Sequence, residues 1–287
     1  MMLIPRTRRV VLFNAIAVAL ACGAVVLSIV PRANAQDAPT PPPKRELKPE
    51  EILQLQAQTP KSQETAKTGK AGAPFDLTGY WVAVIDEDWR WRMIVPDKGD
   101  FSGVPLNLEG RRAADLWNPA NDEKSGEQCR AYGAPSLMRL PTRLHVTWVD
   151  DNTLKIETDY GMQTRLLHFN ETPAAGERSW QGLSLATWEV GTGPIRKDRP
   201  TGPRDLKATT TNLRAGYLRR NGIPYSENAQ LTEYFDLLPN QPNGDEWLIV
   251  NSLVVDPLYL TERFIVSSNF KREADGSKWH PTPCSSR

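Results

Sequence analysis

Hydrophobic and polar residues alternate with a period of two along most of the chain beyond residue 74. Such a period is typical of β-strands, because successive side chains of a strand point to opposite faces. The 89–93 segment (Trp-Arg-Trp-Arg-Met) is a clean example, with two indoles on one face and two guanidiniums on the other. The pattern predicts strands over residues 80–85, 89–93, 144–149, 153–158, 162–169, 182–190, 206–213, 246–255 and 263–271.

Turn residues arrange some of these strands. The Asp150-Asp151-Asn152 turn and the Tyr160-Gly161 turn join the 144–149, 153–158 and 162–169 segments into a predicted antiparallel meander. Residues 108–117 have the one good helical pattern, which Asn118-Pro119 ends, and a single turn is expected near 227–231. The 191–205 segment is rich in Gly, Pro and charge, as expected of a loop. We therefore expect a mainly antiparallel all-β fold, a barrel or a sandwich, with one short helix.

The first 73 residues have a different composition. Arg6, Arg8 and Arg9 precede an apolar run over residues 10–30 and the small-x-small sequence Ala33-Asn34-Ala35, which together predict a signal peptide over residues 1–35. Both Sec and twin-arginine export fit, so we expect a periplasmic or secreted protein with no membrane span after cleavage. An uncleaved anchor, and a lipoprotein modified at Cys22, are the alternatives. Residues 36–73 hold six prolines and no aromatic residue, which predicts a disordered linker before a single domain over 74–287.

The net charge of the chain bears on whether it binds nucleic acids. Four arginines lie in residues 1–35, and beyond them acidic residues exceed basic residues by three. A protein that binds a polyanion needs a basic excess, so we expect no nucleic-acid partner. Protein partners cannot be read from this composition.

Two cysteines remain after cleavage, Cys129 and Cys284. An oxidising compartment favours a disulfide between them, with their Cα atoms about 4.4–6.8 Å apart. The bond should tie the C-terminal tail to the domain, with Trp279 and His280 packed beneath it. Two free thiols are the alternative.

No nucleophile elbow, zinc-protease, phosphate-loop, dinucleotide or haem-attachment motif is present in the sequence. A zinc site would need two or three of the histidines (His145, His168 and His280) and a carboxylate to converge. His145 and His168 fall on predicted strands of one meander and could come near each other, while His280 lies in the tail. Hydrogen-bonded or surface imidazoles are the simpler interpretation, so we expect neither a metal nor a cofactor.

Nine tryptophans, all beyond the linker, indicate either a core packed between two sheets or an aromatic-lined cavity. On the second interpretation the protein binds a small lipophilic or aromatic molecule, or sugar rings. The residues expected to contact it are Trp89, Trp91, Trp148, Trp188, Arg165, Arg214 and Tyr225.

A second hypothesis is an enzyme without a cofactor that uses acid–base chemistry, as an isomerase, lyase or hydrolase. His168 and Glu189 are the candidate acid and base, with Tyr225 and Glu227 orienting the substrate and Arg165 or Arg214 holding its charge. Glu233 and Asp256 also lie beside aromatic residues, yet each carboxylate could simply cap a turn or pair with an arginine. A third hypothesis is an envelope accessory protein that binds other proteins and is tethered by the linker.

Gly79-Tyr80-Trp81 resembles the Gly-x-Trp signature of lipocalins, which implies a tryptophan closing the base of a barrel and a late arginine, such as Arg263, as its partner. From Cys129 on, the chain is also similar to a family of exported bacterial proteins to which no reaction is assigned. The similarity implies an exported β-rich fold. The residues that carry it are 180–184 with Trp188-Glu189, Thr210-Thr211-Asn212, 222–227, 232–235 and 256–261.

Overall fold

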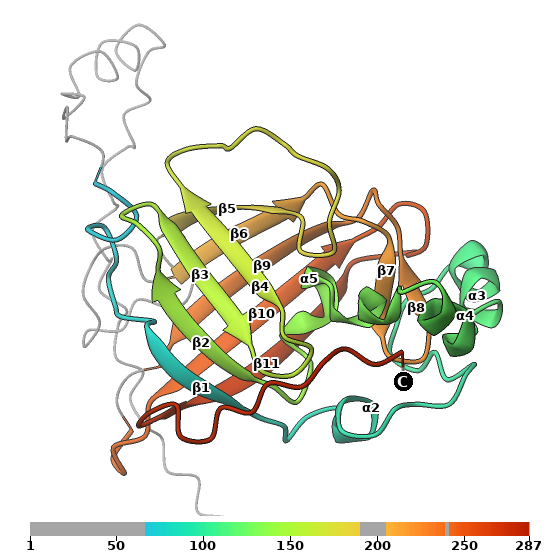
Figure 1. Cartoon of the computed structure of the whole chain (residues 1–287), viewed down its shortest axis with the longest axis horizontal. Coiled ribbons are helices and arrows are strands. Elements are labelled where there is room, and N and C mark those ends of the chain that lie inside the picture. The colour runs from blue at the N-terminus through green and yellow to red at the C-terminus, as the bar shows by residue number, and fades with distance from the viewer. Residues whose placement is uncertain (1–66, 190–204, 239–240, 287) are drawn as a thin grey trace, which may run out of the picture. The chain divides into compact units, whose positions relative to one another are not determined.

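The computed structural model describes residues 67–189, 205–238 and 241–286. Nine strands of the described part close into a barrel, and Figure 1 shows their arrangement. Around the barrel the order is β1-β11-β10-β9-β6-β5-β4-β3-β2, and β2 pairs with β1 again. The barrel strands are β1 (Gly79–Val84), β2 (Arg143–Trp148), β3 (Thr153–Thr158), β4 (Thr164–Phe169), β5 (Leu183–Glu189), β6 (Asp205–Thr211), β9 (Gln230–Leu237), β10 (Trp247–Val255) and β11 (Phe264–Glu273). The expected β fold is confirmed, and of the two architectures it is the barrel.

Neighbouring barrel strands run antiparallel, and the predicted meander is present as β2, β3 and β4. One pair differs: β4 and β5 are parallel, with Leu167 in register with Ser184. The chain between them therefore returns along the barrel before β5 begins.

The start of β1 lies at the same end of the barrel as the ends of β2, β4 and β5, given these strand directions. We call it the aromatic end, because Trp148, Phe169 and Trp188 lie at the ends of those three strands. The opposite end, where the short helices gather, is called the helical end (Figure 1).

Small elements cover the helical end. They are α3 (Leu108–Asp115), α4 (Pro119–Lys124), the 3-10 helix η1 (Gln128–Tyr132), α5 (Ala134–Leu137) and the two-stranded sheet of β7 (Gly216–Arg219) and β8 (Ile223–Tyr225). Every residue of α5 is buried, and Leu137 and Met138 join the main core of the barrel. The segment therefore closes this end of the barrel with apolar side chains.

The predicted helix over 108–117 is confirmed as α3. The Asn107 side chain accepts a hydrogen bond from the Gly110 N–H at its start. Single short helical turns such as α4 and α5 are too brief to show a 3.6-residue period, so they escaped prediction.

The predicted strand over 89–93 is wrong, because these residues form the one-turn helix α2 (Trp89–Arg92). Asp88 takes the left-handed conformation (φ 52°) and breaks the extended chain, and its carbonyl accepts the Trp91 and Arg92 N–H groups at 2.9 and 3.1 Å. Four alternating residues are short enough to fit one helical turn as well as a strand, so the alternation was not decisive.

Trp81 is fully buried, and its indole N–H donates to the Leu77 carbonyl (2.9 Å). The arginine beside it is Arg272, whose guanidinium carbon lies 4.1 Å from the ring centre. Arg263, the expected partner, is exposed and precedes β11. Arg272 can reach Trp81 because the two residues are in register on adjacent strands.

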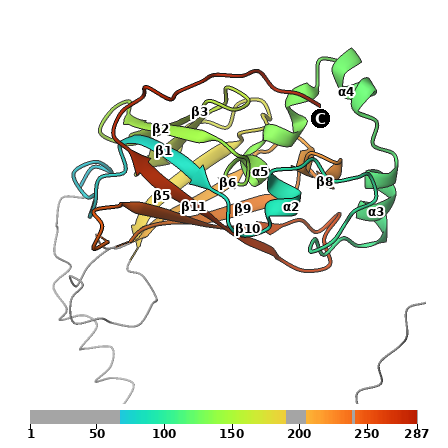
Figure 2. The same ribbon diagram turned by 90° about the horizontal axis from the view of Figure 1, so that it is seen from below.

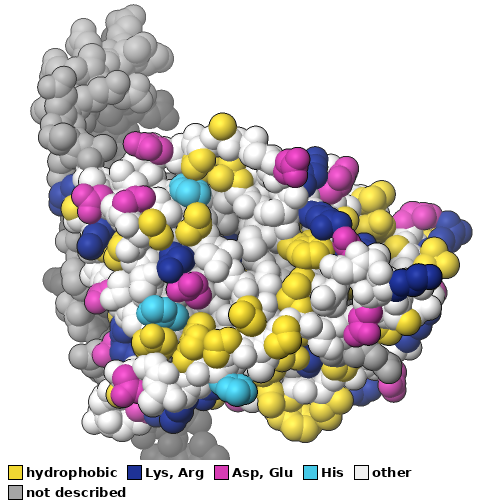
Figure 3. All heavy atoms as spheres, viewed as in Figure 1, with side chains coloured by type: hydrophobic (Ala, Val, Ile, Leu, Met, Phe, Trp, Pro, Cys, Tyr) yellow, Lys and Arg dark blue, Asp and Glu magenta, His cyan; other side chains and the backbone are white. Residues whose placement is uncertain are grey.

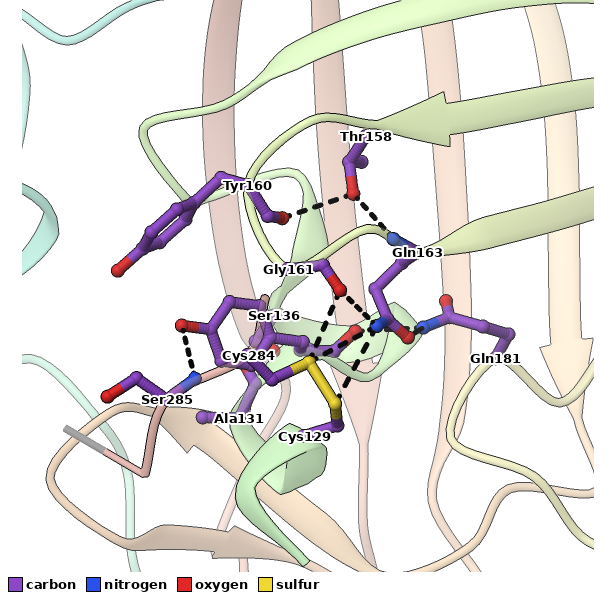
Figure 4. The surroundings of a disulfide bond; sticks show 11 residues. Cys129, Ala131, Ser136, Thr158, Tyr160, Gly161, Gln163, Gln181, Cys284 and Ser285 are labelled. Carbon is purple, nitrogen blue, oxygen red and sulfur yellow. Dashed lines mark hydrogen bonds between the residues drawn. A yellow bond between two sulfur atoms is a disulfide. The ribbon is translucent and has the colours of Figure 1, made fainter. Parts of the chain in front are cut away.

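The Cys129–Cys284 disulfide is present, with the Cα atoms 5.1 Å apart, and Figure 4 shows its surroundings. Figures 1 and 2 show the tail running from the end of β11 to the helical end. Two residues before Cys284, the Thr282 N–H of the tail donates to the Asp159 carbonyl, and the Thr282 carbonyl accepts the Gly161 N–H (2.9 Å each). The expected packing beneath the disulfide is wrong, since Trp279 packs on Tyr80 and His145, and His280 is exposed.

Residues 1–66 and 190–204, which carry the predicted signal peptide, most of the linker and the predicted loop, lie outside the described residues. No helix within the described ranges is both long enough and apolar enough to cross a membrane.

Candidate functional site

A layer of polar side chains lies inside the barrel, at inward-facing positions of several strands. Its centre is an ion pair in which Arg165 Nη2 donates to Glu233 Oε2 at 2.7 Å, with both side chains 0% exposed. The same nitrogen lies 3.3 Å from Ser184 Oγ and 3.2 Å from Thr210 Oγ1, and the two hydroxyls are 2.7 Å apart. These four residues are called the polar layer, and Ser268 is a further buried serine on the inward face of β11.

The polar layer is incompletely bonded. Arg165 Nε and Nη1, Glu233 Oε1 and Ser268 Oγ are enclosed and have no hydrogen-bond partner among the described residues. Leaving such a group unbonded costs about 1–3 kcal/mol, and more when it is charged. These atoms are enclosed so tightly that the packing leaves no room beside them for a water-sized group.

Aromatic rings pack at the aromatic end. Phe169 lies 5.4 Å from both Trp148 and Trp188 between ring centres, and Phe75 meets Trp188 edge-on at 5.4 Å. These four residues are called the aromatic cluster. Phe75 comes from the segment before β1, while the other three are the inward-facing ends of β2, β4 and β5.

The strand register links the cluster to the polar layer. On β5 the inward positions run Trp188, Ala186, Ser184, and on β6 the residues opposite them are Leu206, Ala208 and Thr210. Two alanines in register thus separate an aromatic position from a polar one. We call this set of inward positions the β5–β6 column. At its middle level both strands contribute only a methyl group.

Residues 67–76, called the strap, cross the aromatic end. β5 lies four strands from β1 around the barrel, so a chain that bonds to β5 and then enters β1 must pass over the opening. The Gly69 carbonyl accepts the Trp188 indole N–H (2.7 Å), the Gly69 N–H donates to Asn152 Oδ1 (2.9 Å), and the Lys70 N–H donates to the Asp151 carbonyl (2.9 Å). The strap therefore covers the aromatic cluster and is held mainly by the β2–β3 turn and Trp188.

The composition of residues 67–73 predicts that they belong to the linker. The described chain is already hydrogen-bonded to the barrel from Lys67 on, since the Asn170 amide donates to the Lys67 carbonyl (3.0 Å).

Two surface pockets border this end. One, of about 660 Å³, is lined by Lys70, Ala73, Pro74, Phe75, Asp76, Thr78, Thr147 and Trp148. The other, of about 520 Å³, is lined by Asp150, Asp151, Asn152, Thr153, His168, Phe169, Glu171 and Pro173. Both pockets reach members of the aromatic cluster.

Three of the residues predicted to contact a ligand face the interior of the barrel. Trp148 and Trp188 belong to the aromatic cluster, and Arg165 lies deeper in the same barrel. Arg165 was expected to hold a substrate charge, but its charge is already balanced by Glu233.

The other predicted ligand-contacting residues lie elsewhere. Trp89 is 54% exposed on α2, and the indole N–H of Trp91 donates to Asp100 (3.1 Å). Arg214 stacks on Trp180 at 4.7 Å and pairs with Glu127.

Tyr225 is buried at the helical end, and its hydroxyl has no partner among the described residues. A Cβ added to Gly133 or Gly216 would lie only 2.1 or 2.5 Å from that hydroxyl, so the two glycines leave the ring its space. Burial raises the pKa of Tyr225 well above its usual range.

The three candidate catalytic residues are not brought together. His168 faces outward on β4, in register with Leu185 on β5. Glu189 lies four residues beyond Leu185, about 13 Å at ~3.3 Å per residue, and pairs with Lys207 (2.9 Å). Glu227 is exposed near the helical end, 3.6 Å from Arg178. Within the described residues no group of three or more His, Cys, Asp or Glu side chains could hold a metal ion.

Sequence reasoning missed most of the polar layer. The sequence pattern marks Glu233 only as a carboxylate beside aromatic residues, because β9, the strand that carries it, is not among the predicted strands. The alternation Leu231-Thr232-Glu233-Tyr234-Phe235 is its signal, and it places a glutamate on the inward face. Asp256, the other carboxylate noted there, caps a turn by accepting the Ser226 N–H and hydroxyl at 2.6 and 2.7 Å.

The geometry describes a barrel with an aromatic opening, a strap across it and an incompletely bonded polar layer inside. None of the protein-family models, curated proteins or solved structures that were compared with the chain matches it.

Proposed function

We propose that this protein is exported and that its barrel binds a small, mostly apolar molecule carrying a ring, which enters at the aromatic end. The observation that carries the proposal is the β5–β6 column, in which an aromatic, a small and a polar position follow one another into the barrel. A ring would pack on Trp188 and Phe169, and the rest of the molecule would pass the two alanines.

The strap is the removable part of this site. Its Gly69 carbonyl takes the only hydrogen bond that the Trp188 indole makes among the described residues, and its Phe75 ring covers the same indole. When the strap lifts, Trp188 regains a free N–H and an open ring edge. A ligand with an acceptor atom and a ring can then replace both contacts.

Export is supported by the N-terminal sequence pattern and by the Cys129–Cys284 bond, which is the kind of bond that persists in an oxidising compartment. We place the protein in the periplasm or outside the cell on these grounds.

A second candidate function, binding of a protein partner in the envelope, is favoured by the segment around α2. Trp89, Met93 and Ile94 expose about half of their surfaces within six residues of chain, and Figure 3 shows hydrophobic side chains gathered over this part of the molecule. Such a patch is a common mark of an interaction surface. A Trp89→Ser variant separates the two functions, because it should weaken partner binding and leave small-molecule binding unchanged.

The primary proposal is tested by screening phenols, indoles, terpenoids and aromatic alcohols for stabilisation of the mature protein, with native mass spectrometry to confirm a one-to-one complex. A ligand at one hundred times its Kd should stabilise the fold by about 2.7 kcal/mol. Trp188→Leu should weaken the best binder at least tenfold. The matched control Trp89→Leu, at an exposed site, should leave it unchanged. If no compound binds, or if both variants bind as the unmodified protein does, the proposal is wrong.

A further inference from the structure

The larger of the two pockets at the aromatic end combines aromatic walls with polar side chains. Its volume is about 660 Å³, within the range of about 300–1,000 Å³ that is usual for small-molecule sites. We call it the strap pocket, because Lys70, Phe75 and Asp76 of the strap line it together with Thr147 and Trp148 of β2. We propose that the strap pocket binds a neutral sugar ring. The pocket is formed with the strap in place, so this inference does not rest on the function proposed above.

Two aromatic side chains form the apolar wall of the strap pocket. Trp148 packs on Phe169 at 5.4 Å and Phe75 meets Trp188 edge-on at the same distance, so other members of the aromatic cluster hold both rings in place. Both rings also line the pocket. The C–H groups on one face of a pyranose are attracted to the negative face of an aromatic ring. The wall therefore suits the apolar face of a sugar.

Polar groups with free hydrogen-bonding capacity accompany this wall. Within the described part of the chain, the Lys70 ammonium, the Thr147 hydroxyl and the Trp148 indole N–H make no hydrogen bond. Asp76 Oδ1 accepts the N–H and the hydroxyl of Thr78 at 2.8 and 2.7 Å, which fixes the carboxylate and leaves Oδ2 free to accept. A sugar hydroxyl both donates and accepts, so a sugar can bond all of these groups. A hydrocarbon ring would bond none of them.

The charges around the pocket favour a neutral ligand. Lys70 and Asp76 are the ionisable residues that line it, and their charges cancel. Hydrogen bonds from these ions to neutral hydroxyls are stronger than bonds between two neutral groups. The smaller pocket at the same end is lined by Asp150, Asp151 and Glu171. These carboxylates repel an anion that approaches the aromatic end and draw a cation to themselves instead.

The strap pocket is held in shape before a ligand arrives. The Lys70 N–H donates to the Asp151 carbonyl (2.9 Å), and Arg272 Nη2 donates to the Asp76 carbonyl (2.8 Å). The lining segment of the strap is thus fixed at both of its ends, and the facing residues lie on a barrel strand. A site that is already ordered loses less conformational freedom on binding.

The test is a calorimetric titration of the mature protein with four neutral sugars: methyl β-glucopyranoside, cellobiose, maltose and N,N′-diacetylchitobiose. We expect at least one of them to bind with a Kd of about 1 mM or lower. Sorbitol, which carries the hydroxyls without the ring, should bind at least tenfold more weakly than the best sugar, and so should glucuronate and protonated glucosamine. If none of the four sugars binds, or if sorbitol or an ion binds most tightly, the inference is wrong.

Two variants test the wall and the polar groups separately. Trp148→Leu removes the aromatic wall and should weaken the best sugar at least tenfold. Thr147→Val keeps the shape of the side chain, loses its hydroxyl and should weaken the sugar at least threefold. The matched controls are Trp89→Leu, at an exposed site on α2, and Thr187→Val, at an exposed outward position of β5. Both controls should bind the sugar as the unmodified protein does.

Thr147→Val keeps the test decisive if Trp148→Leu fails to fold, because Thr147 lies on the outward face of β2. Equal sugar affinities in Thr147→Val and Thr187→Val overturn the assignment of the sugar to this pocket. The function proposed above is judged by the aromatic compounds and by Trp188→Leu, so either proposal can fail without the other.

Discussion

Arg272 on the last barrel strand lies over the Trp81 ring on the first, with its guanidinium carbon 4.1 Å from the ring centre. The same guanidinium donates to the Thr78 and Asp76 carbonyls at 2.5 and 2.8 Å and to Glu246 at 2.7 Å. One side chain thus joins the two strands at which the chain begins and ends the barrel, and it anchors the strap where the strap enters β1.

Replacing Arg272 should therefore destabilise the whole domain. We expect Arg272→Met to lower the free energy of unfolding by about 2 kcal/mol, because it removes a cation–π contact and charge-assisted hydrogen bonds. Urea unfolding measures the change. Arg263→Met is the control, and because Arg263 is exposed, that variant should stay within about 0.5 kcal/mol of the unmodified protein. Equal losses in the two variants would contradict the assigned role.

The disulfide should stabilise the fold without being needed for it. Cys129 and Cys284 are 155 residues apart in the sequence, and closing so long a loop is worth about 4–5 kcal/mol in the chain-entropy model. The double variant Cys129→Ser/Cys284→Ser should melt at a lower temperature and keep its β-sheet circular dichroism. A variant that is unfolded at 25 °C, or one that melts as the oxidised protein does, is the contrary result.

The strap depends on a glycine that touches the aromatic cluster. A Cβ at Gly69 would lie 2.4 Å from Phe169 Cγ, too close for any side chain without movement of the strap or the ring. Gly69→Ala should therefore lift the strap and expose the indole of Trp188 to acrylamide quenching. A ligand that enters at the aromatic end should then bind at a higher association rate.

Gly176→Ala is the matched control for this change, because nothing lies within 4 Å of the Cβ it adds. Unchanged quenching in Gly69→Ala relative to Gly176→Ala would show that the strap does not cover the cluster in solution.

Alkaline pH should unfold the protein through its buried tyrosines. Burial raises the pKa of Tyr132, Tyr217 and Tyr225 above the ordinary value of 10.0. Between the unfolded and the folded pKa, the unfolded chain binds fewer protons than the folded one, so stability falls as pH rises through 10 and upward. Absorbance at 295 nm should show these three phenols ionising only on unfolding. Their ionisation near pH 10 in the folded protein would contradict this.

Removing the hydroxyl should change the unfolding free energy differently at Tyr217 and at Tyr225. The Tyr217 hydroxyl bonds Asp122 at 2.9 Å, whereas the Tyr225 hydroxyl is buried without a partner among the described residues. Tyr217→Phe should cost about 1–2 kcal/mol in unfolding free energy, and Tyr225→Phe should be neutral or stabilising. A larger loss for Tyr225→Phe would reveal a hydrogen-bond partner for its hydroxyl.

Many of the barrel strands could be predicted because hydrophobic and polar residues alternate along a half-buried strand, and this alternation is visible in the sequence. Pairing could not be predicted in the same way. Nothing in β4 or β5 alone specifies that they run parallel, and the choice between barrel and sandwich depends on whether β2 meets β1 again. The 89–93 segment shows that alternation alone can also mislead. Its pattern is typical of a strand, but the left-handed conformation of Asp88 starts a helical turn there.

The candidate site was predictable where its residues lie on strands that were recognised, as Trp148, Trp188 and Arg165 do. The inward position of Glu233 was not predicted, because a charged residue on an inward face contradicts the apolar pattern that identifies a buried strand. The strap was missed because its composition is that of the linker before it, and its contacts depend on residues far along the chain, such as Asn152 and Trp188.

We propose that a ligand occupies the barrel interior along the β5–β6 column. Calorimetric titration of Ala186→Leu and Thr187→Leu with the best-binding aromatic compound of the screen tests this proposal. Ala186 faces inward between Trp188 and Ser184, while its neighbour Thr187 faces solvent on the same strand. We expect at least a tenfold loss of affinity in Ala186→Leu and none in Thr187→Leu. Equal affinities in the two folded variants, or no binding by the unmodified protein, would contradict it.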